Sequence, residues 1–462
     1  MTEVESRAAQ RLHERLETIV AILDARVDGV LAPGAETELR AQLSDLHPAD
    51  IAFILESLPL DDRLATWQLV KSGYDGDILL EVSDAVRESL IADMDRHEIL
   101  AAAETLDTDE LADLVDDLPS AMLPELMASL DAEQRAQLQS ALSYRDDQLG
   151  ALMDFEMVTI REDVSLEVVL RYLRRFEELP AQTDKLFVVN KDNLLTGVLP
   201  LHWLLVNPPE QMVSAVMAPD VNTFHPDDDV YEVAQAFERY DLVTAPVIDA
   251  RGHLIGRITV DAMVDVIREE AESEALSRGG LREEEDIFAS VWKSLRNRWA
   301  WLAINLMTAF IASRVIGLFE GSIERLVALA ALMPIVAGIG GNSGNQTITM
   351  IVRALALNQI SPASARRLWR KEMAVALING LVWGGVIGIA AWLLYDNPAL
   401  GVVMTAAMAL NLLLAAFCGV GIPMLMARFG RDPAIGSSVL ITAMTDSGGF
   451  FIFLGLATAF LV

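Results

Sequence analysis

A single acidic residue, Asp446, lies deep within a long apolar run of the 462-residue chain. It stands in the stretch ITAMTDSGGFFIF, where two glycines follow almost at once. An ionisable side chain at this depth in an apolar segment is costly, and it usually faces a water-filled path. The alternative is a contact between helices in which the carboxylate bonds the hydroxyl of Thr445 or Ser447. We expect Asp446 to carry function, and the glycines to let another helix or a hydrated ion approach.

A second polar group interrupts another apolar run, MPIVAGIGGNSGNQTITM, at residues 333–350. Its proline and glycines can bend or unwind a helix and expose carbonyls, which survive in a membrane only where they line a cavity or are buried in protein. The residues concerned are Pro334, Gly338, Gly340, Gly341, Gly344, Asn342, Asn345, Gln346, Thr347 and Thr349. Tight packing of helices through the glycines is the alternative. Carbonyls, amides, hydroxyls and a carboxylate together suit a hard cation and disfavour soft metals.

Five segments are apolar and long enough to cross a membrane, because a helix needs about 20 residues to span a core of roughly 30 Å. They cover residues 299–319, 324–354, 374–396, 399–427 and 434–461. The sequence therefore predicts an all-α transmembrane domain at 299–462, surrounded by membrane lipid. Asp446 and the polar group at 333–350 lie inside two of its helices.

Basic residues indicate which loops of this domain face the cytoplasm, since Lys and Arg concentrate on that side. They precede the first span and follow the second and fourth, whereas the opposite loops, EGSIER and YDNPAL, contain only Arg325. The basic residues are Lys293, Arg296, Arg298, Arg353, Arg366, Arg367, Arg370, Lys371, Arg428 and Arg431. We expect a multi-pass protein of the cell (inner or plasma) membrane, with residues 1–298 in the cytoplasm and the C-terminus outward.

The negative charge of the chain is concentrated ahead of the apolar segments. The net charge is −32, yet only six of the 67 acidic residues follow residue 298. Such an acidic surface argues against nucleic acid as a partner, because phosphate binding needs Lys and Arg. It favours cations, although an acidic surface that only keeps the protein soluble is the alternative. All six histidines precede the apolar segments and the single cysteine is Cys418, which argues against a pore for zinc or copper.

Residues 1–149 are expected to form a helical domain of stacked repeats. LHPADIAFILESLP at 46–59 resembles LDTDELADLVDDLP at 106–119. Each segment has an acidic residue near a helix start, apolar residues at helical spacing and a closing Leu-Pro. Stacked helical units that bury one stripe against their neighbours show this pattern.

A second repeat fills residues 150–267. FVVNKDNLLTGVLPLHWLL at 187–205 matches PVIDARGHLIGRITVDAMV at 246–264, and in both an apolar strand leads through a charged turn to a second strand and a helix. This β-α-β-β-α pattern resembles a tandem pair of CBS domains, which implies an α/β fold that senses nucleotides or ions. A charged connecting helix is expected at 268–298, with a Gly-Gly break at 279–280.

The whole chain resembles the MgtE-type magnesium channels. The resemblance rests on GGNSGNQTITMIVRALAL, on the single Asp in TDSGG, and on the order of helical domain, CBS pair and five spans. It implies a homodimer with a pore on its two-fold axis, in which Asp446 of both copies holds a hydrated Mg²⁺. It implies a connecting (plug) helix beneath the pore. It also implies a path shaped by carbonyls near Gly338 and Gly341 and by the side chains of Asn342, Asn345 and Thr349.

The chemistry of Mg²⁺ fits such a path. Mg²⁺ gives up water reluctantly and prefers six oxygens, so a pore should contact its hydration shell and not remove it. A membrane potential of 100 mV supplies about 4.6 kcal/mol for a divalent ion, and the sequence has no GxxxxGK[ST] phosphate-binding loop. We therefore expect a channel for Mg²⁺ influx. No acid–base pair or activated nucleophile is visible, so we do not expect an enzyme.

Carboxylates of the cytoplasmic part are expected to sense Mg²⁺. Carboxylates that face one another across domain interfaces repel until a divalent cation bridges them, and the bridged state would close the pore when Mg²⁺ is high. The resemblance implies this role for Asp241, Asp265, Glu270, Glu274 and Asp432, with Asp229 from the same CBS repeat as Asp241. The helical domain offers Asp107, Asp109, Glu110 and Asp113.

Three positions depart from the family pattern. Ala262, Ser273 and Tyr231 stand where the resemblance implies acidic residues. With fewer carboxylates we expect a sensor of lower Mg²⁺ affinity, so that closure needs more Mg²⁺ than is usual in the family.

Other ligands and functions stay open from the sequence. Asp249 and Asp261, between the strands of the second CBS repeat, could hold the ribose of a nucleotide such as ATP or could cap turns. The transported ion could be Co²⁺ or Mn²⁺. A non-conducting membrane sensor of cations or nucleotides is the alternative from another class of protein.

Overall fold

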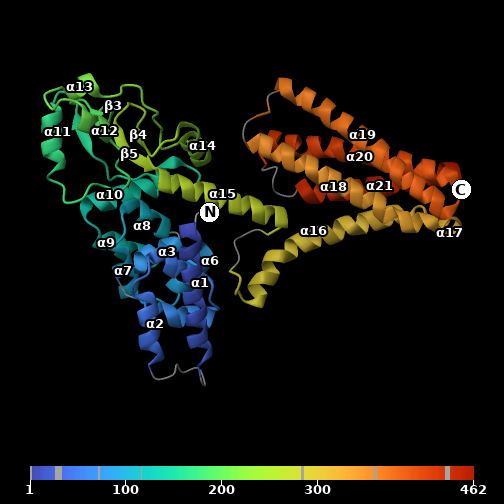
Figure 1. Ribbon diagram of the computed structural model, residues 1–462, viewed down its shortest axis with the longest axis horizontal. Helices are drawn as coiled ribbons and strands as arrows, with labels where there is room; N and C mark the ends of the chain where they lie inside the picture. The colour runs from blue at the N-terminus through green and yellow to red at the C-terminus, as the bar shows by residue number, and fades with distance from the viewer. Residues whose placement is uncertain are drawn as a thin grey trace. The chain divides into compact units, whose positions relative to one another are not determined.

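The computed structural model describes residues 3–26, 34–70, 73–115, 117–281, 286–356, 359–360, 362–431 and 437–462. Figure 1 traces the chain from the N-terminus in blue to the C-terminus in red. Two compact units make up the chain, and each has its own hydrophobic core. The first unit consists of Met1–Ala271 and Glu284–Ala289, and the second of Glu272–Glu283 and Ser290–Val462.

Short helices follow one another through the N-terminal part of the first unit. They are α1 (Glu3–Asp24), α2 (Ala35–Leu43), α3 (Pro48–Glu56), α4 (Leu60–Trp67), α5 (Asp75–Glu81), α6 (Asp84–Ile91), α7 (Arg96–Ala103), α8 (Thr108–Val115), α9 (Leu123–Ser129) and α10 (Ala132–Ala141). Helices α4, α6, α8 and α10 each begin 24 residues after the one before. Their apolar sides share one core, which includes Leu55, Leu90, Leu111 and Leu138. The prediction of stacked helical repeats is confirmed.

Arginines join the two helices of a repeat. Arg63, Arg87 and Arg135 each use Nε to donate to the carbonyl eight residues earlier, at 2.9, 2.7 and 2.6 Å respectively. A second guanidinium nitrogen reaches the carbonyl five residues earlier, as from Arg135 Nη2 to Leu130 at 2.9 Å. These carbonyls lie at or just after the end of a helix, where the regular helical hydrogen bonds no longer supply every donor. The arginine of one helix therefore caps the helix before it.

The two segments compared in the sequence do not occupy equivalent places in this repeat. Residues 46–59 cover α3, the first helix of a pair, whereas 106–119 cover α8, the second helix of a later pair. They begin 60 residues apart (106 − 46), which is not a multiple of the 24-residue spacing of the helices. The two segments look alike because every short helix here combines an acidic start with apolar residues at helical spacing. The arginine-to-carbonyl bonds, which lie between helices, identify the true register.

The second half of the first unit contains two similar α/β repeats. Its elements are β1 (Thr159–Arg161), α11 (Leu166–Leu173), β2 (Lys185–Val189), β3 (Leu195–Pro200), α12 (Leu201–Val206), α13 (Val213–Val216), α14 (Val230–Tyr240), β4 (Thr244–Ile248), β5 (Leu254–Thr259) and α15 (Val260–Gly279). Strand β1 is parallel to β2, whereas β2–β3 and β4–β5 are antiparallel pairs. A bridge between Leu194 and His253 joins the two repeats at their turns. The predicted tandem CBS pair is confirmed.

Helix α15 closes the second repeat and continues past residue 267, where the sequence placed the end of the CBS pair. It ends at Gly279, and the next helix begins only at Val291. The expected connecting helix at 268–298 is therefore not a single helix. Gly280 has a φ of 78°, a left-handed conformation that ends helices and favours glycine. A Cβ at this position would also collide with the indole of Trp301.

Long helices build the second unit: α16 (Val291–Gly317), α18 (Ala328–Ala356), α19 (Pro362–Tyr395), α20 (Pro398–Arg428) and α21 (Ser437–Leu461), with the short α17 (Glu320–Arg325) between the first two. Within the described ranges, α16, α19, α20 and α21 are long and apolar enough to cross a membrane. Helix α18 has 29 residues, which is also long enough, but it carries the polar group. Helix α20 packs against α18, α19 and α21, and it is largely buried.

Helix α18 is continuous from Ala328 to Ala356, with Pro334 inside it. The expectation that proline and glycines unwind this segment is wrong. Proline removes one backbone donor, but α20 and α21 pack along the helix and hold it in shape. The carbonyls of Gly338 and Gly341 therefore lie within a helix, and its side chains are the more accessible oxygen ligands.

Replacing Arg135 with Ala should loosen the last helical repeat, because the carbonyls of Met127 and Leu130 lose their donors. We expect amides of α9 and α10 to exchange with solvent roughly 5- to 150-fold faster, which corresponds to about 1–3 kcal/mol. Hydrogen exchange of the full-length protein, read by mass spectrometry, measures this.

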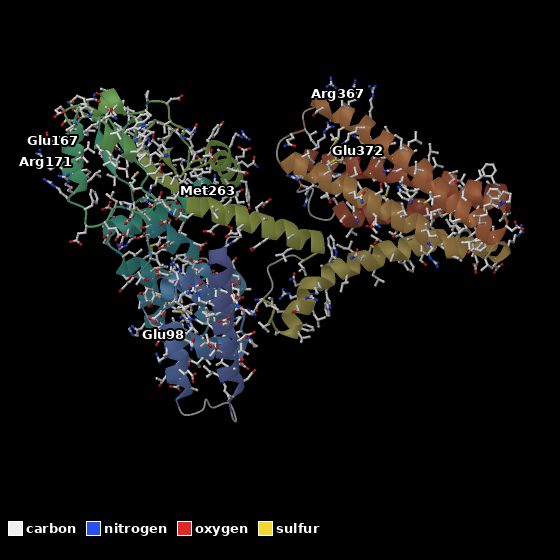
Figure 2. The ribbon with its side chains drawn as sticks, in the orientation of Figure 1. Glu98, Glu167, Arg171, Met263, Arg367 and Glu372 are labelled. Atoms are coloured by element: carbon white, nitrogen blue, oxygen red, sulfur yellow. The ribbon has the colours of Figure 1, made fainter. Side chains whose placement is uncertain are left out.

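Arg171→Ala is the matched control (Figure 2). Arg171 pairs with Glu167 on the surface, where their side chains are 69% and 62% exposed. Such an exposed pair contributes little, so its loss should change exchange by less than about twofold. Unchanged exchange in Arg135→Ala would show that the capping bonds do not hold the repeat together.

Candidate functional site

One face of α18 is built for close packing. A Cβ on Gly344 would lie 2.5 Å from Ile441 Cδ1 of α21, and a Cβ on Gly340 would collide with the Asn411 amide of α20. Glycine at both positions lets the helices approach, as small residues do between membrane helices. For Gly340 and Gly344, tight packing is what the structure shows.

The opposite face of α18 is polar and open. Gly338, Asn342, Asn345 and Thr349 recur every three or four residues, the spacing that places them on one side of a helix. Nothing lies within 4 Å of a Cβ built on Gly338, Asn342 and Thr349 are exposed, and Asn345 is half-buried. In an apolar unit, such a face needs water or protein against it.

Helices α18 and α21 run antiparallel, and their contacts show which residues lie at the same level. Ser438 Oγ donates to Asn345 Oδ1 at 3.3 Å. Further along, a Cβ on Gly341 would lie 3.8 Å from Thr445 Oγ1. Asp446 follows Thr445, so it lies level with Gly341. The fold thus brings Asp446 beside the polar face of α18.

The Asp446 carboxylate is half-buried. In the described part of the chain it has no hydrogen-bond or ion-pair partner. The Thr445 hydroxyl donates to Ile441 O at 2.9 Å, within its own helix. The alternative from the sequence, a contact between helices in which Asp446 bonds the hydroxyl of Thr445 or Ser447, is therefore not seen among the described residues.

Glu372 on α19 is a further acidic residue of this unit (Figure 2), and the sequence pattern did not single it out. Its side chain is buried; Oε2 accepts from Thr347 Oγ1 of α18 at 3.5 Å, and Oε1 lies 3.3 Å from Lys371 Nζ. The predicted span began at residue 374, so Glu372 fell in a loop. The available signal was its position between the basic Lys371 and an uninterrupted helical pattern.

Helix α15 presents carboxylates to the helical repeats. Burial raises the pKa of Glu269, and the nearby carboxylates of Asp113 and Asp84 raise it further. Burial also raises the pKa of Asp265, against the opposing effect of Arg268. Asp265 and Asp113 are among the acids that the sequence predicts to take part in sensing Mg²⁺.

Arg87 lies among the same acids of α6 and α8. It is buried, and Nη1 is 3.3 Å from Asp113 and 3.1 Å from Asp117. Its charge partly compensates their repulsion, but burial still raises the pKa of Asp117. The surface facing α15 therefore keeps an excess of negative charge.

A second group of acids lies where the helical repeats meet the CBS pair. Burial raises the pKa of Asp109 to about 7, with Asp154 as the next cause. Asp154 is also buried, and it pairs with Arg257 at 2.7 Å. The sequence named Asp109 but missed Asp154 and the neighbouring Glu156, because no local pattern distinguishes them from surface acids.

The remaining acids of α14 and α15 that the sequence predicts as sensors have different contacts. Asp229 caps α14, accepting from the backbone N–H of Tyr231 and Glu232 at 3.0 and 3.1 Å. Asp241 ends the same helix with a φ of 51°. Glu270 bonds the Tyr231 hydroxyl; burial and this carboxylate raise the pKa of Tyr231 to about 12.

Two predicted sensor residues cannot be placed: Asp432 and the side chain of Glu274 lie outside the described residues. Ala262 packs against the core of the second CBS repeat, and Ser273 is exposed on α15. Across the described ranges, no three His, Cys, Asp or Glu side chains gather closely enough to hold a metal ion. The acids approach one another without forming a closed cage.

Neither possible nucleotide residue shows a free binding geometry in the second CBS repeat. Asp249 accepts from the N–H of Arg251 and of His253, both at 2.8 Å, and from the His253 ring at 2.9 Å. The hydrogen bond with His253 lowers the pKa of Asp249 to about 2. Asp249 therefore caps a turn, and Asp261 is exposed in the first turn of α15.

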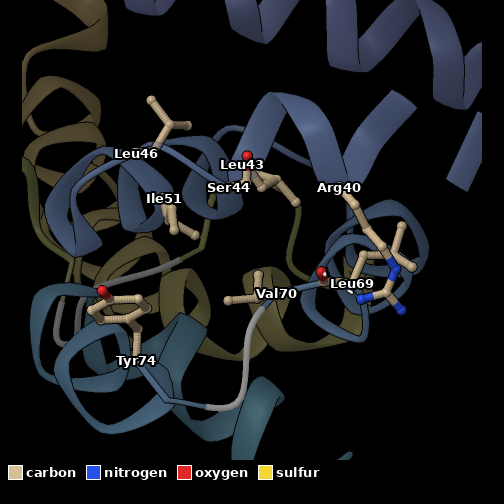
Figure 3. Close-up of a pocket in the computed structure, with 8 residues that line it drawn as sticks. All are labelled: Arg40, Leu43, Ser44, Leu46, Ile51, Leu69, Val70 and Tyr74. Atoms are coloured by element: carbon tan, nitrogen blue, oxygen red, sulfur yellow. Dashed lines mark hydrogen bonds between the residues drawn. The ribbon is translucent and has the colours of Figure 1, made fainter. Parts of the chain in front are cut away.

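Figure 3 shows a pocket between α2, α3 and the segment after α4, and none of the acids described above lines it. Its walls are mainly apolar, with Leu43, Ile51, Leu69 and Val70 among them. Arg40 Nη1 donates to Leu69 O at 3.3 Å at its edge. No carboxylate lines the pocket, so it has no negatively charged ligand for a cation.

Three family models match the chain in the order of its parts. Residues 46–147 match the MgtE intracellular N domain, 213–269 a CBS domain, and 333–456 the MgtE family, described as divalent cation transporters. The last match contains both the polar face of α18 and Asp446.

Relatives match over nearly the whole chain. The magnesium transporter MgtE of Thermus thermophilus is 31% identical over 436 residues, which cover 92% of this chain and 96% of that protein. The Bacillus subtilis protein of the same name is 27% identical, covering 94% and 97%. A crystal structure of the cytosolic domain of the Mg²⁺ channel MgtE in complex with ATP is 30% identical, with a TM-score of 0.47, over 54% of this chain and 99% of that one. This chain belongs to the MgtE family of divalent cation transporters.

Proposed function

We propose that this protein is a channel for Mg²⁺, which enters the cell through a path lined by α18 and α21 and is stopped when cytoplasmic Mg²⁺ is high. The observation that carries the proposal is the open polar face of α18 beside Asp446 in an otherwise apolar unit. The two relatives that match most of the chain are named magnesium transporters.

The available ligands suit a hydrated ion. Amide and hydroxyl oxygens of Asn342, Asn345 and Thr349 can accept hydrogen bonds from water bound to Mg²⁺, and a carboxylate supplies opposite charge. One Asp446 per chain gives a single carboxylate. A homodimer with the path on its two-fold axis would supply two, facing a hydrated ion between them.

Influx needs no further energy source. A potential of 100 mV, negative inside, favours entry of a divalent cation by about 4.6 kcal/mol. Basic residues at the start of α16, at the end of α18 and at the start of α19 favour a cytoplasmic location for the first unit. By the same rule the C-terminus of α21 faces outward.

The acids of the first unit provide a way to close the path. Glu269 approaches Asp113 and Asp84, and Asp109 approaches Asp154, so the compact arrangement brings like charges together. Bound Mg²⁺ would relieve this repulsion and stabilise the compact state. Asp241, Asp265, Glu270, Glu274 and Asp432 are proposed to take part in this sensing, with Asp229 fixing the start of α14.

The substituted sensor positions should weaken Mg²⁺ binding. Tyr231 offers Glu270 a hydroxyl donor where a carboxylate would share a cation. Ala262 and Ser273 bring no charge. Nucleotide binding, ATP included, remains a proposal from the CBS fold, and the turn-capping role of Asp249 does not favour it.

An ion pair holds the segment before α16 to the helical repeats. Asp286 lies just before α16, and it pairs with Arg63 of α4 through two bonds, Nη1–Oδ2 at 2.7 Å and Nη2–Oδ1 at 3.0 Å. Arg63 is fully buried and the Asp286 side chain is 10% exposed. We propose that this pair lets the helical repeats pull on the chain that enters α16.

Asp446→Asn should reduce Mg²⁺ uptake into proteoliposomes with low internal Mg²⁺ by at least about tenfold, because the path loses its fixed charge while side-chain size is kept. Asp396→Asn is the matched control: it removes an acid from the loop between α19 and α20, where Asn tolerates the φ of 50°. Flux that persists in Asp446→Asn rejects this site. Uptake of Co²⁺ or Mn²⁺ in preference to Mg²⁺ rejects the proposed ion, and a parent protein without flux favours a non-conducting sensor.

Lowering the pH should stabilise the Mg²⁺-free cytoplasmic unit. The folded-state pKa of Asp109 is about 7 against 3.8 normally, so the folded state binds the extra proton and gains stability as pH falls through 7. When the pH is lowered from 8 to 6, we expect the Tm of the cytoplasmic unit to rise by a few degrees, since about 1 kcal/mol corresponds to roughly 2–4 °C. Calorimetry of the full-length protein measures this.

Mg²⁺ at pH 8 should give a similar rise in Tm, and Asp109→Asn should remove most of both effects. Glu167→Gln, at an exposed position of α11, should keep them. A pH dependence that Asp109→Asn leaves intact would place the titrating group elsewhere.

Asp286→Asn should weaken closure without stopping conduction, because it leaves the buried Arg63 charge without its partner. We expect the Mg²⁺ concentration that half-closes the path to rise about fivefold or more. Flux measured against internal Mg²⁺ tests this. Asp163→Asn, which removes the exposed partner of Arg161, should behave as the parent; an equal half-closing concentration in Asp286→Asn contradicts the coupling.

A further inference from the structure

Asn411 is a polar side chain at the centre of the second unit. It lies on α20 and is fully buried. Its Nδ2 donates to the Val336 carbonyl of α18 at 2.8 Å. Its Oδ1 is buried and has no hydrogen-bond partner among the described residues. One amide thus joins two helices and leaves one acceptor unused.

The same amide fills the space left by two glycines. A Cβ on Gly340 of α18 would collide with Asn411 Nδ2. A Cβ on Gly449 of α21 would lie 2.7 Å from Nδ2 and 3.0 Å from Oδ1. Any other residue at these positions would force the amide, the helix or both to move. The Asn411 side chain is therefore the point where α18, α20 and α21 meet.

Both glycines stand next to residues of the proposed path. Gly340 lies between Gly338 and Asn342 on α18, and Gly449 lies one turn after Asp446 on α21. A side chain that fixes Gly340 and Gly449 against α20 also fixes the separation of the polar face from the carboxylate. Within a low-dielectric interior, the bond to Val336 further resists sliding of α18 along α20.

A residue chosen only for stability would not be asparagine here. Burying an amide oxygen without a donor is unfavourable, and an apolar side chain of similar size avoids that cost. Among the described residues Oδ1 is unpaired, which costs stability, whereas the bond from Nδ2 fixes α20 against α18. The side chain therefore suits the placement of the helices better than their stability alone.

We propose that Asn411 is a positioning residue of the ion path: it sets the spacing between the polar face of α18 and Asp446 without touching the ion. This inference rests on the proposed function, because it takes these two groups as the lining of the path.

The test compares Asn411→Leu with Thr405→Val in proteoliposomes. Thr405 is a matched control on the same helix: its hydroxyl donates to Gly384 O of α19 at 3.1 Å and to Gly401 O at 3.0 Å, away from α18 and α21. We expect Asn411→Leu to keep or raise the Tm while it lowers Mg²⁺ uptake about tenfold or shifts the ratio of Co²⁺ to Mg²⁺ uptake about fivefold. Thr405→Val should leave that ratio unchanged.

A second readout does not depend on flux. Asn345→Cys with Ser438→Cys, in a Cys418→Ala background, places a cysteine on each side of the seam between α18 and α21, where the native side chains are 3.3 Å apart. Adding Asn411→Leu should slow disulfide formation between them at least fivefold, whereas adding Thr405→Val should not.

The outcomes separate the two proposals. A parent protein that conducts, with uptake, ion ratio and cross-linking all unchanged in Asn411→Leu, overturns the positioning role and leaves the channel intact. Losses of Tm and uptake in parallel, at an unchanged cross-linking rate and ion ratio, also overturn it, because a general structural defect explains them. If the parent does not conduct, the channel is rejected and the cross-linking rate alone decides whether Asn411 positions the helices.

Discussion

Polar groups inside the apolar second unit must bond other protein groups or lie on a face that water can reach. This constraint determines how its helices are arranged. Helix α18 meets this constraint because it has two different faces. Glycines on one side let α20 and α21 pack closely, and amide and hydroxyl side chains lie on the other side. The buried Asn411 and Glu372 each bond a group on α18. Polar side chains in this unit thus either form a bond between helices or lie on the open face of α18.

In the first unit, the constraint on the fold is repulsion between carboxylates. The helical repeats are held by arginines that cap the preceding helix, and some of these guanidinium groups also bind acids. Arg87 still leaves Glu269 facing an excess of negative charge. Asp109 and Asp154 approach one another in the same way where the repeats meet the CBS pair. Such an arrangement is stable only in part, because like charges lie close together.

Much of the fold follows from local patterns, and the errors show where such patterns end. Strand and helix periodicity identified the CBS pair and the long apolar helices, because each signal lies within one element. The similarity of residues 46–59 and 106–119 did not mark the register of the helical repeats, since that register is defined by bonds between helices. The expected unwinding of α18 was wrong for a similar reason: proline and glycine weaken an isolated helix, but α20 and α21 support this one. Glu372 and Asp154 were missed because their partners, Thr347 and Arg257, are distant in the sequence.

The sequence by itself determined which chemistry is available: a lone carboxylate and a group of amides in apolar helices, and an acidic cytoplasmic part with basic loops at the membrane. Those properties depend on residue type and on spacing within a helix. Only the tertiary structure decided which of these groups meet. It divided the glycines of α18 into those that pack and those that face open space, placed Asp446 level with Gly341, and paired Arg63 with Asp286. These are contacts between separate elements, and their geometry is set by packing that no local pattern contains.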